Sequence, residues 1–339
     1  MERQRARPHD GVWRAPQPYG FSLRNALSFD LEDYMHVTAF SDQVGAADWD
    51  NCVSRLEHNT EKLLEILGTN SCIATFFTLG WVAKKFPMVI RQIADAGHEI
   101  ACHSMWHRLV YELSPTEFKN DTQEAKAVLE DTSGKVVRGY RAPSFSITSD
   151  AWWAFDVLRE LEFTYDSSIF PVKHPNYGVP NGSRVPFSVQ TPNGPIVEFP
   201  LPTLEVGSMR APFGGGAYLR LLPYIYTRWA IDYTNRNEEA PICVYLHPWE
   251  IDAEQPRMKA SLTARVRHYI GLRGTENKLR RLLSDFEFVA LDVLVREWES
   301  GQAQASISPH GQLLDDLPTD SAVPSTAACA SSRSGKERQ

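Results

Sequence analysis

The chain has 339 residues, of which 42% are hydrophobic and 23% charged, so it has enough apolar material for one large domain or two small ones. The net charge is −7 and no lysine or arginine block stands out, which argues against nucleic acid or an anionic membrane surface as a partner. The sequence has no run of about 18 apolar residues, so it predicts no membrane-spanning helix.

Residues 1–22 contain arginine, proline and glycine without periodicity, and we expect a flexible arm there. This segment also lacks the apolar core of a secretory signal. The five cysteines are widely spaced, and no Cys-x-x-Cys pair occurs, which is typical of reduced thiols. Together these features predict a cytoplasmic protein.

Strand-like and helix-like segments alternate through the first half of the chain. The predicted strands are residues 25–30, 72–77, 98–102, 136–140 and 163–165, and the predicted helices are residues 51–67, 81–96, 115–130 and 148–161. Pro87 predicts a separate first turn in the second helix. Ser114, followed by Pro115 and Glu117, predicts the start of the third. Regular alternation of this kind predicts βαβ units and a parallel sheet.

The composition changes after Pro171, where prolines and glycines crowd together. Residues 185–190 and 196–199 predict a hairpin across the turn at Asn193 and Gly194. We interpret residues 171–240 as an elaboration inside the domain, with a flexible glycine loop at 214–216. A helix at 217–235, a strand at 242–246, a helix at 261–285 and a strand at 288–294 are expected to follow. Residues 301–339 are rich in small and polar residues, which predicts a disordered tail.

Polar residues suited to metal binding or acid–base chemistry come directly after the predicted strands. They are Asp30, Glu32, Asp33, His103, His107, Arg141, Asp166 and His247. Two histidines four residues apart on a helical turn can reach one ion, and imidazole suits zinc and its first-row neighbours. In α/β barrels the chemistry lies at the carboxyl ends of the strands, which is where these residues fall.

The ordered set of Asp-Leu-Glu-Asp, His-x3-His, Arg-Ala-Pro, Asp-Ser-Ser and Leu-His-Pro resembles the five motifs of the NodB-type polysaccharide deacetylases, carbohydrate esterase family 4. The resemblance covers about residues 25–250. The Asp-x-Glu-Asp-Tyr opening and the long segment after Pro171 look closest to the branch found with bacterial exopolysaccharide and exosortase systems. The resemblance implies an α/β fold, a distorted seven-stranded (β/α) barrel, over residues 23–300, with a Pro/Gly-rich elaboration and a C-terminal helical extension.

The resemblance also implies roles for the catalytic residues. Asp30 would be the general base and His247 the general acid. Arg141 would hold Asp30 in its ionised form, and Asp166 would orient His247 and keep it protonated.

For the metal, the resemblance implies His103 and His107 as nitrogen ligands together with one carboxylate. Either Glu32 or Asp33 is a candidate for that carboxylate. We favour Asp33, because an alignment with the family's adjacent aspartates and one inserted residue keeps its side-chain length.

Three residues are candidates for substrate contact. Pro143 would fix a turn that points the backbone N–H of Ser144 at a developing oxyanion. Trp249 would stack on a sugar ring or, equally well, belong to the core.

The implied function is metal-dependent removal of N-acetyl groups from an N-acetylated sugar in a polysaccharide or its precursor. The metal would be zinc or another first-row divalent ion. Two alternatives stay open: a metal-independent, allantoinase-like hydrolase of cyclic amides on the same fold, and a catalytically inactive glycan-binding module. The presence of His103 and His107 argues against the first, and that of Asp30 and His247 against the second.

Overall fold

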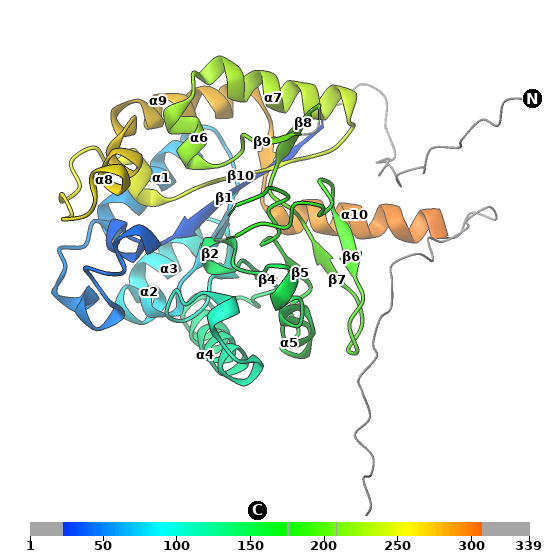
Figure 1. Cartoon of the computed structure of the whole chain (residues 1–339), viewed down its shortest axis with the longest axis horizontal. Coiled ribbons are helices and arrows are strands. Elements are labelled where there is room, and N and C mark those ends of the chain that lie inside the picture. The colour runs from blue at the N-terminus through cyan, green and yellow to red at the C-terminus, as the bar shows by residue number, and fades with distance from the viewer. Residues whose placement is uncertain (1–22, 175–176, 208, 307–339) are drawn as a thin grey trace, which may run out of the picture.

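A curled, mostly parallel sheet organises the computed structural model, which describes residues 23–174, 177–207 and 209–306 (Figure 1). The expected arm at residues 1–22 and the tail beyond residue 306 lie outside this part of the chain. The strand order is β10-β1-β2-β3-β4-β5-β7-β6, and β11 pairs with β1 beside this path. The pairs are parallel except for β6 with β7. The sheet is therefore a half-barrel of nine strands, and the expected count of seven is not confirmed.

The strands of this sheet are short apart from the first. They are β1 (Asn25–Leu31), β2 (Thr75–Thr78), β3 (Glu99–Cys102), β4 (Gly139–Tyr140), β5 (Tyr165–Asp166), β6 (Phe187–Val189), β7 (Ile196–Glu198), β10 (Cys243–Leu246) and β11 (Phe288–Val289). The hairpin predicted after Pro171 is confirmed as β6 and β7, and Gly194 adopts the positive φ of 101° that its turn requires. A second, two-stranded sheet consists of β8 (Thr203–Val206) and β9 (Met209–Pro212).

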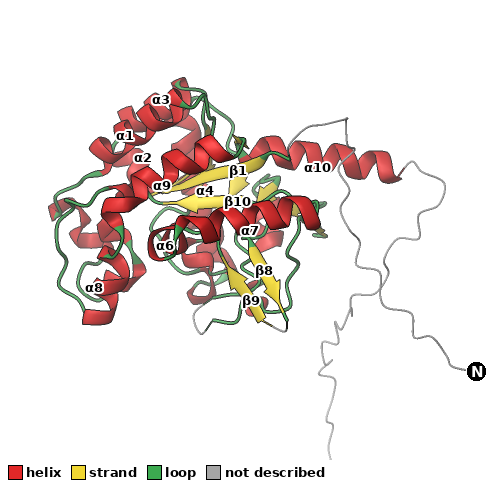
Figure 2. Cartoon of the chain, turned by 90° about the horizontal axis from the view of Figure 1, so that it is seen from above, coloured by secondary structure: helices red, strands yellow, loops and turns green. Residues whose placement is uncertain are grey.

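Helices surround the sheet, as Figure 2 shows from above. They are α1 (Leu56–Thr69), α2 (Gly80–Lys85), α3 (Pro87–Asp95), α4 (Pro115–Ser133), α5 (Ala154–Glu160), α6 (Gly216–Leu221), α7 (Tyr224–Asn237), α8 (Leu262–Tyr269), α9 (Leu272–Asp285) and α10 (Leu291–Ser306). The break at Pro87 and the capping box of Ser114 with Glu117 are confirmed. Two helices that the sequence predicts as continuous are each divided, by Pro223 between α6 and α7 and by Gly271, at φ 78°, between α8 and α9.

Strand β1 determines which polar side chains reach the interior of the half-barrel. All seven of its residues are buried. Leu27 and Leu31 pack in the main core with the surrounding helices, whereas Ala26, Ser28 and Asp30 face inward. This alternation follows from the two-residue period of a strand, and it places the Asp30 carboxylate inside the half-barrel.

Helix α10 packs against the inner core of the half-barrel. Leu291, Leu294, Val295 and Trp298 share one buried cluster with Ala26 of β1 and with other inward-facing residues. The sequence predicts a strand over residues 288–294, and this prediction is wrong beyond Val289, because the apolar residues from Leu291 onward recur at helical spacing. The helix also runs to Ser306, past the predicted tail boundary at Gly301, and its later turns project from the molecule (Figure 1). Among the described residues, no helix is both long enough and apolar enough to cross a membrane.

We predict that Leu294→Ala lowers the free energy of unfolding by about 2–5 kcal/mol, because it opens a cavity where α10 meets the inner core. Leu221→Ala, on the half-exposed side chain at the end of α6, is the matched control and should cost far less. Denaturant unfolding of both variants measures the difference. Equal losses would contradict the role of α10 as part of the core.

Candidate active site

A buried ion pair between Arg141 and Asp30 lies at the carboxyl ends of the strands. Arg141 Nη1 donates to Asp30 Oδ1 at 2.7 Å, and both residues are almost fully buried. The guanidinium also donates to the hydroxyl of Ser28 and to the hydroxyl and carbonyl oxygens of Ser167, and it lies 4.0 Å from the centroid of the Phe77 ring. A buried charge is tolerated when its donors are satisfied in this way. The expected pairing of Arg141 with Asp30 is confirmed, and it fixes the orientation of the carboxylate.

The spacing of His103 and His107 predicts a helical turn. In the structure the two histidines lie instead in a tight loop after β3. Ser104 and His107 have positive φ angles of 68° and 53°. The N–H of Met105 donates to Asp121 Oδ2 at 2.7 Å, which anchors the loop to α4. Left-handed backbone at non-glycine residues costs energy and occurs where surrounding contacts impose it, often at functional sites. Here it brings the rings of His103 and His107 to a centroid distance of 5.5 Å.

The protonation state of His103 is set by its surroundings. Its Nδ1 lies 2.8 Å from the backbone carbonyl oxygen of Arg141. Because a carbonyl oxygen only accepts, Nδ1 carries the proton and Nε2 keeps a free lone pair. Burial lowers the pKa of His103 to about 4, so the ring is neutral at physiological pH. A neutral imidazole held in this way is suited to bind a metal ion.

Glu32 and Asp33 point to different places. Glu32 Oε2 lies 2.9 Å from His107 Nε2, and ligand atoms of Glu32, His103 and His107 all lie within 4.8 Å of one another. Asp33 instead accepts hydrogen bonds from the N–H of Tyr34 at 2.8 Å and, at its other oxygen, from Ser54 and Arg55.

The structure thus brings Glu32 to the histidines and uses Asp33, which the sequence analysis favours as the ligand, to cap a turn. The reason is the strand period. Glu32 follows Asp30 at a spacing of two residues, so its side chain points to the same face. Asp33 is three residues from Asp30, so its side chain points to the other face.

His247, directly after β10, completes the group of polar residues. Its Nε2 lies 3.1 Å from Glu32 Oε1 and 3.9 Å from Asp30 Oδ2, and its Nδ1 lies 3.3 Å from Glu250 Oε2. Burial alone would lower the pKa of His247. The hydrogen bonds to Glu250 and Glu32 and the charges of these carboxylates outweigh that effect and raise the pKa to about 10.

Glu250 is a functional residue that the sequence analysis did not identify. Burial opposes its ionisation, but the charges of Arg220 and His247 outweigh this and lower its pKa to about 2. Its Oε1 accepts from Arg220 Nε at 2.8 Å, and its Oε2 also accepts from the N–H of His247 at 3.0 Å. A sequence signal existed, because a proline and then a glutamate at the first and third positions after His247 form a capping pattern.

Gly216 makes room for this arrangement. A Cβ at Gly216 would lie 1.7 Å from Glu250 Oε2, and one at Gly215 would lie 2.4 Å from the Tyr245 hydroxyl. Close packing therefore requires these glycines, where the sequence analysis expects a flexible loop.

Asp166, which the sequence analysis pairs with His247, makes its contacts elsewhere. It accepts from the N–H and the hydroxyl of Ser168 at 3.0 and 2.7 Å, and it shares a hydrogen bond with the Glu198 carboxyl group. Burial raises the pKa of Asp166 to about 6 and that of Glu198 further. The N–H of Ala142 donates to the Ser168 hydroxyl at 2.8 Å, so Asp166 supports the turn that follows Arg141. The carboxylate beside His247 Nδ1 is that of Glu250.

The three expected substrate contacts have different surroundings. Trp249 is only 4% exposed, and its ring stacks on His247 and His268 at centroid distances of 5.1 and 4.2 Å, so it packs against the proposed acid and offers no open face to a sugar. Pro143 is buried in a short turn, in which Ser144 has a φ of 51° and its hydroxyl lies 2.7 Å from that of Thr38.

Comparison with known families divides the chain into two segments. Residues 40–165 match the family described as Polysaccharide deacetylase. This segment is therefore similar to polysaccharide deacetylases. Residues 167–296 match a second model, described only as Domain of unknown function (DUF3473).

Curated relatives match parts of the chain. The chain is 32% identical over 84 residues to a peptidoglycan-N-acetylglucosamine deacetylase of Bacillus cereus, covering 25% of this chain and 30% of the relative. It is 35% identical over 85 residues to a chitooligosaccharide deacetylase of Azorhizobium caulinodans, covering 25% and 40%. The chain therefore spans less than half the length of these relatives.

Solved structures show the same fold over most of the chain. A putative polysaccharide deacetylase from Mycobacterium smegmatis superimposes with a TM-score of 0.54 at 18% identity, covering 90% of this chain and 99% of that one. A probable polysaccharide deacetylase from Pseudomonas aeruginosa PAO1 gives 0.54 at 15% identity, covering 82% and 91%. The curled parallel half-barrel is therefore a fold that these two solved structures share.

The cluster of polar residues draws on both matched segments. His103, His107 and Arg141 lie within the first segment, whereas His247 and Glu250 lie within the second. The site is therefore complete only when the two segments fold together.

We predict that Glu250→Gln lowers the pKa of His247, because it removes the negative charge beside Nδ1 while keeping the side-chain shape. NMR titration of the chelator-treated protein measures the ring without any contribution from a metal ion. The wild-type pKa should be near 10, and Asp166→Asn should leave it in place. A fall in Asp166→Asn with no change in Glu250→Gln would restore the pairing expected from the sequence.

Proposed function

We propose that this protein is a metal-dependent hydrolase that removes N-acetyl groups from an N-acetylated sugar in a polysaccharide or its precursor. The observation that carries the proposal is the arrangement of Asp30 and His247 beside one group of metal-binding residues. Arg141 holds Asp30 on one side, and Glu250 holds His247 on the other.

Glu32, His103 and His107 suit a divalent ion. Two imidazole nitrogens and one carboxylate oxygen form a ligand set found in catalytic zinc sites, so zinc is the expected ion, with other first-row metals as alternatives. Glu32 Oε2 is buried and lies 2.9 Å from His107 Nε2, and no other donor among the described residues reaches it. A buried carboxylate oxygen of this kind is costly unless a cation compensates it. When bound, the ion would supply Lewis-acid activation of the amide carbonyl and of a water molecule.

Asp30 is the proposed general base. Arg141 occupies Oδ1, which leaves Oδ2 on the side of His247 to accept a proton from the attacking water.

His247 is the proposed general acid. Its raised pKa keeps the ring protonated at neutral pH, and Glu250 beside Nδ1 contributes to that rise. Transfer of the Nε2 proton to the amide nitrogen lets the sugar amine leave as acetate forms. Glu250, which the sequence analysis missed, therefore has the orienting role first given to Asp166.

The substrate and setting are part of the same proposal. The Asp-x-Glu-Asp-Tyr opening and the long segment after Pro171 favour a glycan of the exopolysaccharide branch. The names of the relatives make peptidoglycan and chitooligosaccharides the comparison substrates. The cytoplasmic location stays a prediction, supported by the cysteines that are free within the described part of the chain, Cys52, Cys72, Cys102 and Cys243.

We predict that His103→Ala, His107→Ala and Glu32→Gln each lose stoichiometric metal while the fold survives, because each removes one ligand. Asp33→Asn is the control and should keep the metal, since its oxygens accept hydrogen bonds from a turn. Elemental analysis of the purified variants measures the occupancy. Full occupancy in Glu32→Gln together with loss in Asp33→Asn would reverse the assignment.

We predict that Asp30→Asn and His247→Ala each lower kcat by roughly 10²–10⁴ with metal still bound, the usual contribution of a positioned acid or base. The assay is acetate release from N-acetylated exopolysaccharide fragments, chitooligosaccharides and peptidoglycan fragments.

In Glu250→Gln the basic limb of the pH profile of kcat/KM should move to lower pH, because His247 loses its proton at lower pH, while the acidic limb stays in place. Near-normal turnover in His247→Ala would remove the proposed acid, and no acetate release from any glycan by the metal-loaded wild type would overturn the function.

A further inference from the structure

Positive charge is concentrated in one stretch of this acidic protein. Residues 256–275 contain five cationic side chains and no aspartate or glutamate, in a chain whose net charge is −7. These side chains are Arg257, Lys259, Arg265, Arg267 and Arg273. They are spaced apart along the chain, so the sequence shows no basic block and argues against an anionic surface as partner. The fold instead gathers the stretch around α8, which lies at the outer edge of the molecule in both views (Figure 1, Figure 2).

The same stretch exposes three large aliphatic side chains. Leu262 is 75% exposed, Val266 52% and Ile270 46%. Their spacing of four residues places them along one side of α8 and its end. Basic side chains alone would suit any polyanion, but exposed aliphatic residues between them favour a surface with an apolar layer beneath its charge.

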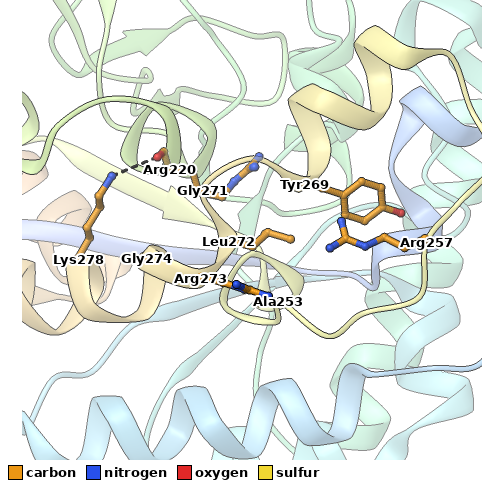
Figure 3. Close-up of a pocket in the computed structure, with 9 residues that line it drawn as sticks. All are labelled: Arg220, Ala253, Arg257, Tyr269, Gly271, Leu272, Arg273, Gly274 and Lys278. Carbon is orange, nitrogen blue, oxygen red and sulfur yellow. Dashed lines mark hydrogen bonds between the residues drawn. The ribbon is translucent and has the colours of Figure 1, made fainter.

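A cavity of about 370 Å³ lies beside this helix, between the 253–257 loop and the start of α9 (Figure 3). The guanidinium of Arg257 lies 4.2 Å from the ring centroid of Tyr269. The Tyr269 hydroxyl accepts from the N–H of Met258 at 2.7 Å and donates to the carbonyl of Pro256 at 3.1 Å, which fixes the loop that carries Arg257.

The opposite wall of the cavity is also suited to an anion. Helix α9 begins there after Gly271 without a side-chain cap, so its N-terminus presents a partial positive charge. Arg273, which is exposed, lines the same cavity, whereas Lys278 is engaged with the backbone carbonyls of Leu219, Arg220 and Leu222. Arg257 and Arg273 are therefore the cations available to a phosphate-sized group.

We propose that the basic edge, defined as residues 256–275, docks this protein on an anionic lipid surface. Leu262, Val266 and Ile270 enter the boundary between headgroups and acyl chains, and a lipid phosphate binds in the cavity beside Arg257 and Arg273. A short helix with aliphatic residues on one side and arginines around it is suited to lie in such an interface, where each cation adds electrostatic attraction. The proposal does not depend on the proposed chemistry.

The test is co-sedimentation of the full chain with vesicles of phosphatidylcholine alone and of phosphatidylcholine mixed with phosphatidylglycerol. The wild type should bind the anionic vesicles selectively and less tightly as salt rises. Arg257→Gln with Arg273→Gln should weaken binding by about 25-fold, from roughly 5-fold for each cation near the surface. Leu262→Ser with Val266→Ser should also weaken it.

Matched controls come from α7. Arg236→Gln and Ile225→Ser alter side chains of comparable exposure outside the basic edge and should bind as the wild type does. Thermal unfolding followed by circular dichroism confirms that each variant is folded. The salt dependence of vesicle binding is measured on the wild type, so it tests the proposal even where a variant fails to fold.

Equal binding to neutral and anionic vesicles would overturn the proposal. So would wild-type binding in the Leu262→Ser and Val266→Ser variant, since the surface would then recognise charge alone. Dextran sulfate is the probe for that case: binding to it that is as tight as to vesicles, and is lost only with the arginines, assigns the surface to an anionic polymer.

Discussion

The buried guanidinium of Arg141 is the interaction on which the rest of the site depends. Its side chain orients Asp30 on β1, and its backbone carbonyl fixes the tautomer of His103 after β3. The Ser28 and Ser167 hydroxyls take further donors, so one side chain connects β1, β4 and β5. A buried cation is stable only when its partners are all in place, which means that the proposed base and one proposed metal ligand are positioned by the same requirement.

Buried carboxyl groups around this centre differ in charge because their partners differ. Glu250 meets a guanidinium and a histidine, and its pKa falls to about 2 against the effect of burial. Asp166 meets a second carboxyl group, that of Glu198, and burial raises its pKa to about 6. Glu250 is therefore held as a negative charge, which suits it to pair with the imidazolium ion of His247. Asp166 and Glu198 share a proton, and their contacts support a turn.

The sequence predicts the order of strands and helices and most of the residues at the strand ends, because these depend on local periodicity and on composition. It does not identify Glu250, because the charge of this carboxylate depends on its pairing with Arg220, thirty positions earlier in the chain. It favours Asp33 over Glu32 by side-chain length, while the inward direction of Glu32 is set by the register of β1. It also predicts a strand where α10 begins, because a short apolar run is compatible with both a strand and a buried helix, and periodicity alone does not separate the two.

The contact between Gly216 and Glu250 has an evolutionary meaning. Gly216 opens α6, which also carries Arg220, so this helix controls both the space and the counter-charge of the carboxylate that holds His247. The border between the two family matches falls near residue 166, and the segment beyond it brings this helix together with the proposed acid. Drift in α6 therefore cannot be neutral for the site: a lineage that remodels this helix must preserve the surroundings of Glu250, and with them the acid strength of His247 on another element.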